Sequence, residues 1–162
     1  MKLNRFNTIS EIDSSLIIPI SDDSNTAPLK KCTIAQLSDY FNSSSIKVVG
    51  VTIDGGGSVP STGVKGYIIV PFSGTIVGWR IVGDVSGSAV ADVWKVAYGA
   101  SLPTVSNTIA ASAKPTLSSS IINKNDTVVG WTTSITADDI IGFNLDSIST
   151  ITKLTIELKV SV

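Results

Sequence analysis

Short apolar runs separated by turn-forming residues dominate the chain after residue 46, and no helical period is present there. The last run shows the pattern most clearly, because Leu154, Ile156, Leu158 and Val160 alternate with polar residues. Alternation of this kind is typical of half-buried β-strands. The sequence predicts eight strands, at residues 47–53, 66–71, 75–82, 89–98, 116–122, 127–133, 139–146 and 153–160.

The stretch 74–95 is dense in branched apolar residues and holds two of the three tryptophans, so we expect the core to form around it. Counting by twos places Val77, Trp79 and Ile81 on one face, which predicts a buried Trp79. Residues 83–88, with the sequence GDVSGS, predict a loop between two antiparallel strands. Many short strands punctuated by Gly, Pro, Asn and Ser predict an all-β fold, a jelly-roll-like antiparallel β-sandwich.

Residues 1–45 follow a different pattern. A short apolar run around Pro19 predicts an edge strand, and Thr33 with Gln36 has the spacing of a capping box. Ile34, Leu37 and Phe41 then follow as one stripe of a helix about eight or nine residues long, too short to persist without packing. We expect a small strand-plus-helix segment at 1–45 and a β-sandwich domain at 46–162, separated by a polar spacer.

Composition favours self-association. Charged residues make up 15% of the chain, the net charge is −1, and the mean hydropathy is +0.35. A surface with so little charge predicts an obligate oligomer, and the absence of a basic excess argues against nucleic acid as a partner. Neither a signal peptide nor an apolar stretch of membrane-spanning length is recognisable, which predicts no membrane insertion and synthesis in a cytoplasm.

Candidate chemistry is sparse. The chain has no histidine and a single cysteine, so imidazole catalysis and an internal disulfide are both excluded. The carboxylate pairs considered for glycosidase chemistry are Asp84 with Asp92 and Asp138 with Asp139, but turn and strand-edge roles are favoured for them. We therefore expect no enzyme and no cofactor. Asp84, with serines at 86 and 88, offers oxygens for a calcium ion, although a satisfied turn is favoured.

Three residues are candidates for contacts with other molecules. Asp92 alternates with Val90 and Trp94, so it faces an apolar side and needs a partner, such as Arg80 or Lys95, or a place at a subunit interface. Trp94 shares that face and is a second candidate for an inter-subunit contact. Trp131 follows a glycine near an expected strand edge; it is a candidate for stacking on a sugar ring, while a core or interface role is favoured.

Two portions of the chain resemble bacteriophage proteins. The segments IDSSLIIPISDD and LKKCTIAQLSDYF are similar to the attachment segment of phage tail and head fibres. The stretches DGGGSVPSTGVKGYIIVPFSGTIVGWRIVGDVSGSAVADVWK and GWTTSITADDIIGFNLDS resemble the β-sandwich of phage fibre and virion proteins. This resemblance implies a homotrimer on a virion, assembled in the host cytoplasm, with the N-terminal segment bound to a capsid or tail protein. It makes Ile34, Leu37 and Phe41 the candidate anchoring residues.

The function that we expect is therefore that of a structural fibre or decoration protein of a phage particle. The alternative is a carbohydrate-binding adhesin that recognises a host-surface glycan, and the two roles are compatible in one fibre. A glycan-degrading enzyme is the third class considered. The resemblance is to fibres of both the phage head and the phage tail, so it fits either position on the particle.

Overall fold

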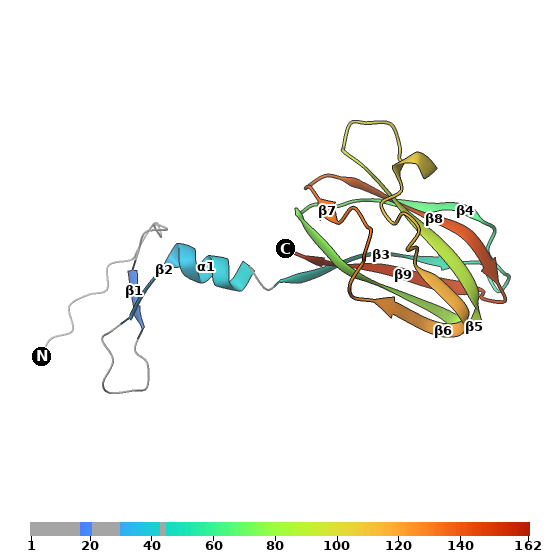
Figure 1. Cartoon of the computed structure of the whole chain (residues 1–162), viewed down its shortest axis with the longest axis horizontal. Helices are drawn as coiled ribbons and strands as arrows, with labels where there is room; N and C mark the ends of the chain where they lie inside the picture. Colours follow the sequence, from blue (N-terminus) through green and yellow to red (C-terminus); the bar gives the residue numbers. More distant parts are fainter. Residues whose placement is uncertain (1–16, 21–29, 43–44) are drawn as a thin grey trace, which may run out of the picture. The chain divides into compact units, whose positions relative to one another are not determined.

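The computed structural model of the protein describes residues 17–20, 30–42 and 45–162 (Figure 1). The contacts within the chain define two compact units, Met1–Ser44 and Ser45–Val162. The boundary expected from the sequence, between residues 45 and 46, lies beside this division. No helix in the described ranges has the length and hydropathy needed to cross a lipid bilayer.

In the first unit, a two-stranded antiparallel sheet precedes a short helix. Strand β1 (Ile17–Ile20) pairs with β2 (Lys30–Thr33), and helix α1 (Ile34–Asn42) follows directly. The expected capping box is confirmed: the backbone N–H of Gln36 donates to Thr33 Oγ1 at 3.1 Å, and the backbone N–H of Thr33 donates to Gln36 Oε1 at 2.9 Å. Ile34 and Leu37 are half-buried, and the side chain of Phe41 lies outside the described residues.

The second unit is a single curled, antiparallel sheet, so the all-β prediction is confirmed. The strands are β3 (Ile46–Asp54), β4 (Gly63–Ile69), β5 (Gly74–Val96), β6 (Thr116–Asn125), β7 (Ser134–Ile135), β8 (Ile140–Ser149) and β9 (Lys153–Ser161). Five of them follow the order β3-β9-β5-β8-β4, while β6 and β7 pair with β5 off this path. A 3₁₀ turn, η1 (Val105–Asn107), lies between β5 and β6.

The sheet curls into two layers, and strand β5 runs through both of them (Figure 1). Strands β8 and β9 follow one another along the same edge of β5, from Val96 opposite Ile140 to Thr75 opposite Ser161. Strand β3 adds to the far side of β9, and β4 adds to the far side of β8. Folding this ribbon at its middle therefore creates one layer from β3, β9 and the first half of β5, and a second layer from β4, β8 and the second half of β5.

The bend in β5 is where a loop was expected, and that prediction is wrong. Residues 83–88 belong to the continuous 23-residue strand. Ile151, in the turn between β8 and β9, is fully buried against the bend. A Cβ on Gly87 would lie 2.6 Å from Ile151 Cγ1, and one on Gly83 would lie 3.2 Å from Ile151 Cδ1. The two glycines therefore make room for an isoleucine at a folded strand, and they do not form a turn.

The core lies between the two layers. Trp79 is 4% exposed and Ile81 is 1% exposed, which confirms the buried face expected for Trp79. A bulge between Ile76 and Gly78 shifts the alternation, so that Ile76 joins the core and Val77 is only half-buried. The indole N–H of Trp79 has no hydrogen-bond partner among the described residues, so packing alone holds this side chain.

The strand expected at residues 127–133 is absent, and this prediction is also wrong. Asn125 Oδ1 accepts hydrogen bonds from the backbone N–H of Thr127 at 2.7 Å and of Val128 at 3.2 Å. An Asn side chain that binds the following backbone in this way replaces the strand ladder with a turn. Val128 and Gly130 both have positive φ, at 38° and 82°, which no regular strand tolerates.

Replacing Gly87 with alanine tests the contact at the bend. Because the new Cβ would lie 2.6 Å from both Ile151 Cγ1 and the Ser149 carbonyl oxygen, we expect Gly87→Ala to lower the free energy of unfolding by about 1–3 kcal/mol. Gly66→Ala is the matched control, since its nearest neighbour, Val51 Cγ2, is 3.7 Å away. Urea denaturation measures both; equal stabilities for the two variants would contradict the role assigned to the bend.

Candidate functional site

The connection between β5 and β6, residues 97–115, returns over β8 and the second half of β5 on the outer side of the β4–β8 layer, while Val64, Tyr67 and Ile69 of β4 stay exposed. Thr108 forms an isolated bridge with Trp94, and the Ile109 N–H donates to the Val93 carbonyl at 2.9 Å. Pro103 lies against Gly142 of β8, where an added Cβ would come within 3.1 Å of Pro103 Cγ. Pro103 and residues 108–110 of the connection therefore pack on the sheet, whereas residues 98–102 are exposed in a loop that stands clear of it (Figure 1).

Asp92 is the centre of the contacts beneath this connection. Its side chain is fully buried, and both carboxylate oxygens accept hydrogen bonds. Oδ1 accepts from the Val93 N–H at 2.8 Å and from Thr108 Oγ1 at 2.6 Å. Oδ2 accepts from Trp94 Nε1 at 3.0 Å and lies 3.0 Å from Lys114 Nζ. Four donors fill the lone-pair positions of an ionised carboxylate.

Lys114 extends this cluster to the neighbouring strand. Its Nζ lies 2.7 Å from Asp146 Oδ2 on β8, and Asp146 Oδ1 accepts from Asn144 Nδ2 at 2.6 Å. The two carboxylates, Asp146 first and Asp92 second, raise the pKa of Lys114 above its usual value. One ammonium group thus joins the connection to both β5 and β8.

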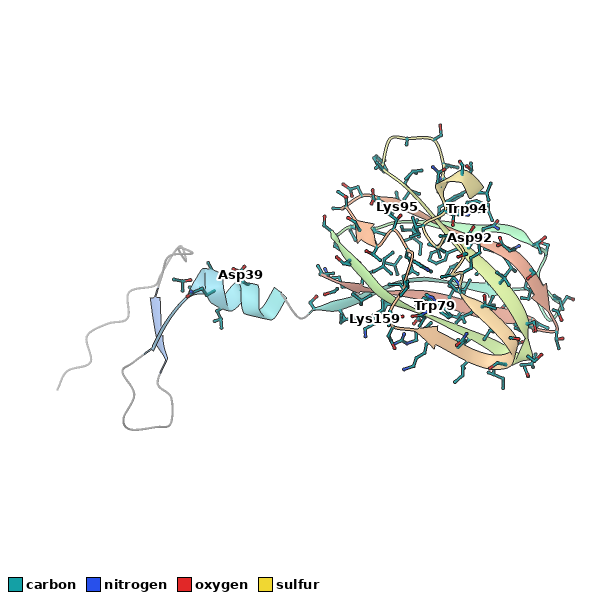
Figure 2. The ribbon with its side chains drawn as sticks, viewed as in Figure 1. Asp39, Trp79, Asp92, Trp94, Lys95 and Lys159 are labelled. Carbon is teal, nitrogen blue, oxygen red and sulfur yellow. The ribbon has the colours of Figure 1, made fainter. Side chains whose placement is uncertain are left out.

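The cluster holds the connection on the sheet, and this corrects two expectations. Asp92 and Trp94, at 0% and 6% exposed, are covered by their own chain, so neither can contact another subunit as expected. The sequence predicted that Asp92 needs a partner, and it has several. They are Lys114, Thr108 and Trp94, and not the expected Arg80 or Lys95. Figure 2 shows Asp92 and Trp94 together, apart from Trp79. Lys114 was missed because it lies in a segment without a strand or helix period.

Trp131 is buried as well, which corrects its assignment as a sugar-binding platform. It is 8% exposed and belongs to the core cluster. Its Nε1 donates to the Ala113 carbonyl at 2.9 Å, which ties the end of the connection to the turn after β6. An indole covered on both sides offers no free face to a sugar ring, so the favoured core reading of this residue is the one observed.

The two carboxylate pairs considered for glycosidase chemistry, Asp84 with Asp92 and Asp138 with Asp139, do not form shared sites. Asp84 accepts from the Thr152 N–H at 3.0 Å and from the Thr152 hydroxyl, whereas Asp92 faces the connection. Asp139 is buried and pairs with Lys95 at 2.9 Å, while its neighbour Asp138 is exposed at a φ of 71°. Within the described residues, no group of three or more His, Cys, Asp or Glu side chains is arranged to hold a metal ion. The Asp84 carboxylate, considered for calcium, accepts from Thr152, as expected for a satisfied turn.

The outer side of the β3–β9 layer carries a surface that nothing in the described unit covers. We call it the open face: the outward-pointing residues of β3, β9, the first half of β5 and β6. Four large apolar side chains on it are 42–67% exposed, namely Ile46, Val48, Val82 and Ile122. A shallow apolar depression of about 430 Å³ lies between β5 and β6, lined by Arg80, Ile81, Val82, Ile122, Asn123 and Lys124. Exposed apolar groups of this kind, here one on β3 and one on β5 and β6, are typical of an interaction surface.

Comparison with known proteins does not place the chain in an established group. No family model, no curated protein and no solved structure matches it. The candidate sites therefore rest on the geometry alone: a saturated carboxylate cluster with a structural role, and an open face suited to contact with another protein surface.

Removing the Asp92 carboxylate tests its structural role. Asp92→Ala would leave the buried Trp94 indole N–H and the Thr108 hydroxyl without an acceptor, so we expect a loss of about 3–5 kcal/mol in the free energy of unfolding. Asp146→Ala removes the more exposed partner of the same lysine and should cost about 1 kcal/mol or less. Chemical denaturation compares the two; an equal cost for both would refute the central role of Asp92.

The acid stability of the protein should depend on Asp84. Hydrogen bonds, first from the Thr152 hydroxyl and then from backbone amides, lower the pKa of Asp84 from 3.8 to about 2. Because the folded state favours the ionised carboxylate, this stabilisation is complete above the unfolded pKa and is lost as the pH falls towards 2. Urea midpoints measured from about pH 5 down to about pH 2 should fall less steeply for Asp84→Asn than for the unmodified protein. Identical slopes would contradict this.

Proposed function

We propose that the chain is a structural fibre or decoration protein of a bacteriophage particle. It acts as a homotrimer, with residues 1–44 attached to a capsid or tail protein and the β unit displayed. Its place is the virion, after assembly in the host cytoplasm. The proposal requires no cofactor and no catalytic step.

The open face is the observation that carries this proposal. Ile46, Val48, Val82 and Ile122 expose apolar surface on one side of a unit that already has a complete core. Only 15% of the residues are charged, so little electrostatic repulsion opposes contact between copies. Both features fit a protein that works within an assembly. The resemblance of the N-terminal segment to phage attachment segments supports the choice of a virion as that assembly.

The first unit suits the attachment role. It is compact by itself, with a two-stranded sheet and a capped nine-residue helix. An isolated helix of this length is marginal in water, so binding to a larger protein would stabilise it. Ile34 and Leu37 lie on one stripe of α1, and together with Phe41 they remain the proposed anchoring residues.

The adhesin alternative depended on Trp131 as an exposed residue that could stack on a sugar ring. Trp131 lies in the core, where it cannot stack on a glycan. We therefore do not extend the proposal to a host-surface carbohydrate.

Deletion of residues 1–44 tests the attachment role. We expect the full-length chain to sediment with purified phage particles, whereas residues 45–162 keep β-type circular dichroism but stay in the supernatant. In the full chain, Leu37→Ala should reduce the particle-bound fraction, and Asp39→Ala, on an exposed position of the same helix, should not. Immunoblots of the sedimented particles measure the bound fraction. Retention of the truncated chain on particles would refute the attachment role.

A further inference from the structure

The open face has a regular layout because its strands are in register. Across the sheet, Thr52 lies opposite Thr155, which lies opposite Val82, which lies opposite Ile122. In the next row, Gly50, Glu157, Arg80 and Lys124 are neighbours in the same order. The face therefore has a β3 side and a β5–β6 side, with β9 between them; of the β9 side chains, Glu157 leans towards β3 and Lys159 towards Asp126 at the end of β6.

Each side of the face carries its own apolar group. Ile46 and Val48 lie on the β3 side and are 49% and 57% exposed. Val82 and Ile122 lie on the β5–β6 side and line the depression of about 430 Å³. The two groups are separated within one copy, so they cannot cover one another. Each could be covered by the opposite side of another copy.

The charges on the two sides are complementary. On the β5–β6 side, Asp126 is surrounded by Arg80 at 2.9 Å, Lys124 at 3.5 Å and Lys159 at 3.9 Å. Three cations and one carboxylate give this group a net charge of +2. Figure 2 shows Lys159 in the layer that contains β9. This side thus has an excess of positive charge beside its apolar depression.

The β3 side carries a carboxylate that has no cation of its own. A Cβ on Gly50 would lie 2.9 Å from Glu157 Cγ, so the Glu157 side chain lies over Gly50 and beside β3. Directly opposite Glu157 is Arg80, but the Arg80 guanidinium binds Asp126 and the Trp79 carbonyl. Within residues 45–162, the Glu157 carboxylate makes neither an ion pair nor a hydrogen bond. Glu157 lines a depression of about 170 Å³ with Ile46, Val48, Arg80 and Lys159, and both of these cations belong to the group around Asp126. The β3 side therefore pairs an apolar group with a carboxylate that makes no ion pair within the unit.

We propose that the open face is the contact between copies of this chain. The β3 side of one copy, with Ile46, Val48 and Glu157, packs on the β5–β6 side of the next copy, with Val82, Ile122 and Lys124. Two different sides of one face meet in this contact, so it is heterologous and closes into a ring about an axis roughly parallel to the strands. Closure at three copies rests on the homotrimer of the proposed function. Apolar burial would supply affinity, and the charges would set the register.

The oligomeric state of the full-length chain tests this contact. Light scattering after size exclusion should give about three times 16.9 kDa for the unmodified protein. Ile122→Asp places a charge in the depression and should give a monomer with unchanged circular dichroism. Val129→Asp is the matched control, because Val129 is 77% exposed outside the open face, and it should leave the oligomer intact.

A charge exchange tests the pairing itself. Glu157→Lys and Lys124→Glu each bring like charges together across the proposed contact, so each should raise the dissociation constant at least about tenfold. The double variant restores opposite charges and should return the dissociation constant to near its original value. Failure of the double variant to recover would overturn the pairing, even if both single variants are weakened.

The outcomes separate this inference from the proposed function. An oligomer that survives Ile122→Asp overturns the open-face contact but leaves the homotrimer in place. A monomeric unmodified chain at micromolar concentration overturns both the contact and the homotrimer. If that monomer still binds particles, and Ile122→Asp abolishes the binding, the open face contacts a different virion protein and the inference is wrong while the virion role stands.

Discussion

The fold of the β unit depends on the contact of Ile151 with the bend of β5. A single strand passes through both layers of the sheet, and it can do so only if its backbone folds back over a compact group. Ile151 supplies that group, and the absence of side chains at Gly83 and Gly87 admits it. Strands β8 and β9 lie on either side of the turn that carries Ile151, so they follow β5 around the same bend. The positions of β3 and β4 follow from theirs.

The bend also decides which residues need cover. In the second half of β5, Ala91 and Val93 point into the core, so Asp92 and Trp94 point outwards. A tryptophan and a carboxylate in that position need to be covered by other residues, and the connection of residues 97–115 covers them. Asp92 is a polar residue on an otherwise apolar strand. Because it accepts hydrogen bonds from Thr108 and Lys114, it holds the connection on the sheet. Removing a carboxylate with four donors is costly, whereas a surface ion pair contributes little.

The sequence predicted the parts that depend on local pattern. The capping box at Thr33 and Gln36, the strand at the C-terminal end and the buried Trp79 all follow from spacing alone. The bend was missed because a glycine in a strand pattern can mark either a turn or a close contact with another group. At Gly83 and Gly87 only the partner, Ile151, distinguishes the two cases. The turn after β6 was missed because one Asn125 side chain outweighs the strand preference of Thr and Val.

The candidate contact residues were the hardest to predict, for a related reason. Alternation places Asp92 and Trp94 on an outward face, and in this respect the pattern was correct. Whether the same chain covers such a face depends on the path of a long connection. This connection has neither a helical nor a strand pattern of apolar residues, so its path cannot be predicted from the sequence. The connection returns over β8 and the second half of β5, so Asp92 and Trp94 are internal, and Trp131 packs beneath its end through the hydrogen bond to the Ala113 carbonyl.

The same geometry leaves the opposite layer uncovered. Strand β6 leaves the connection and pairs with both halves of β5 across the bend, so it widens the β3–β9 layer without lying over it. Ile46, Val48, Val82 and Ile122 therefore remain 42–67% exposed on that layer. One outer face thus obtains the cover for Asp92 and Trp94 from within the chain. The other has an apolar and charge pattern whose two sides complement each other, and another copy of the chain can supply that cover.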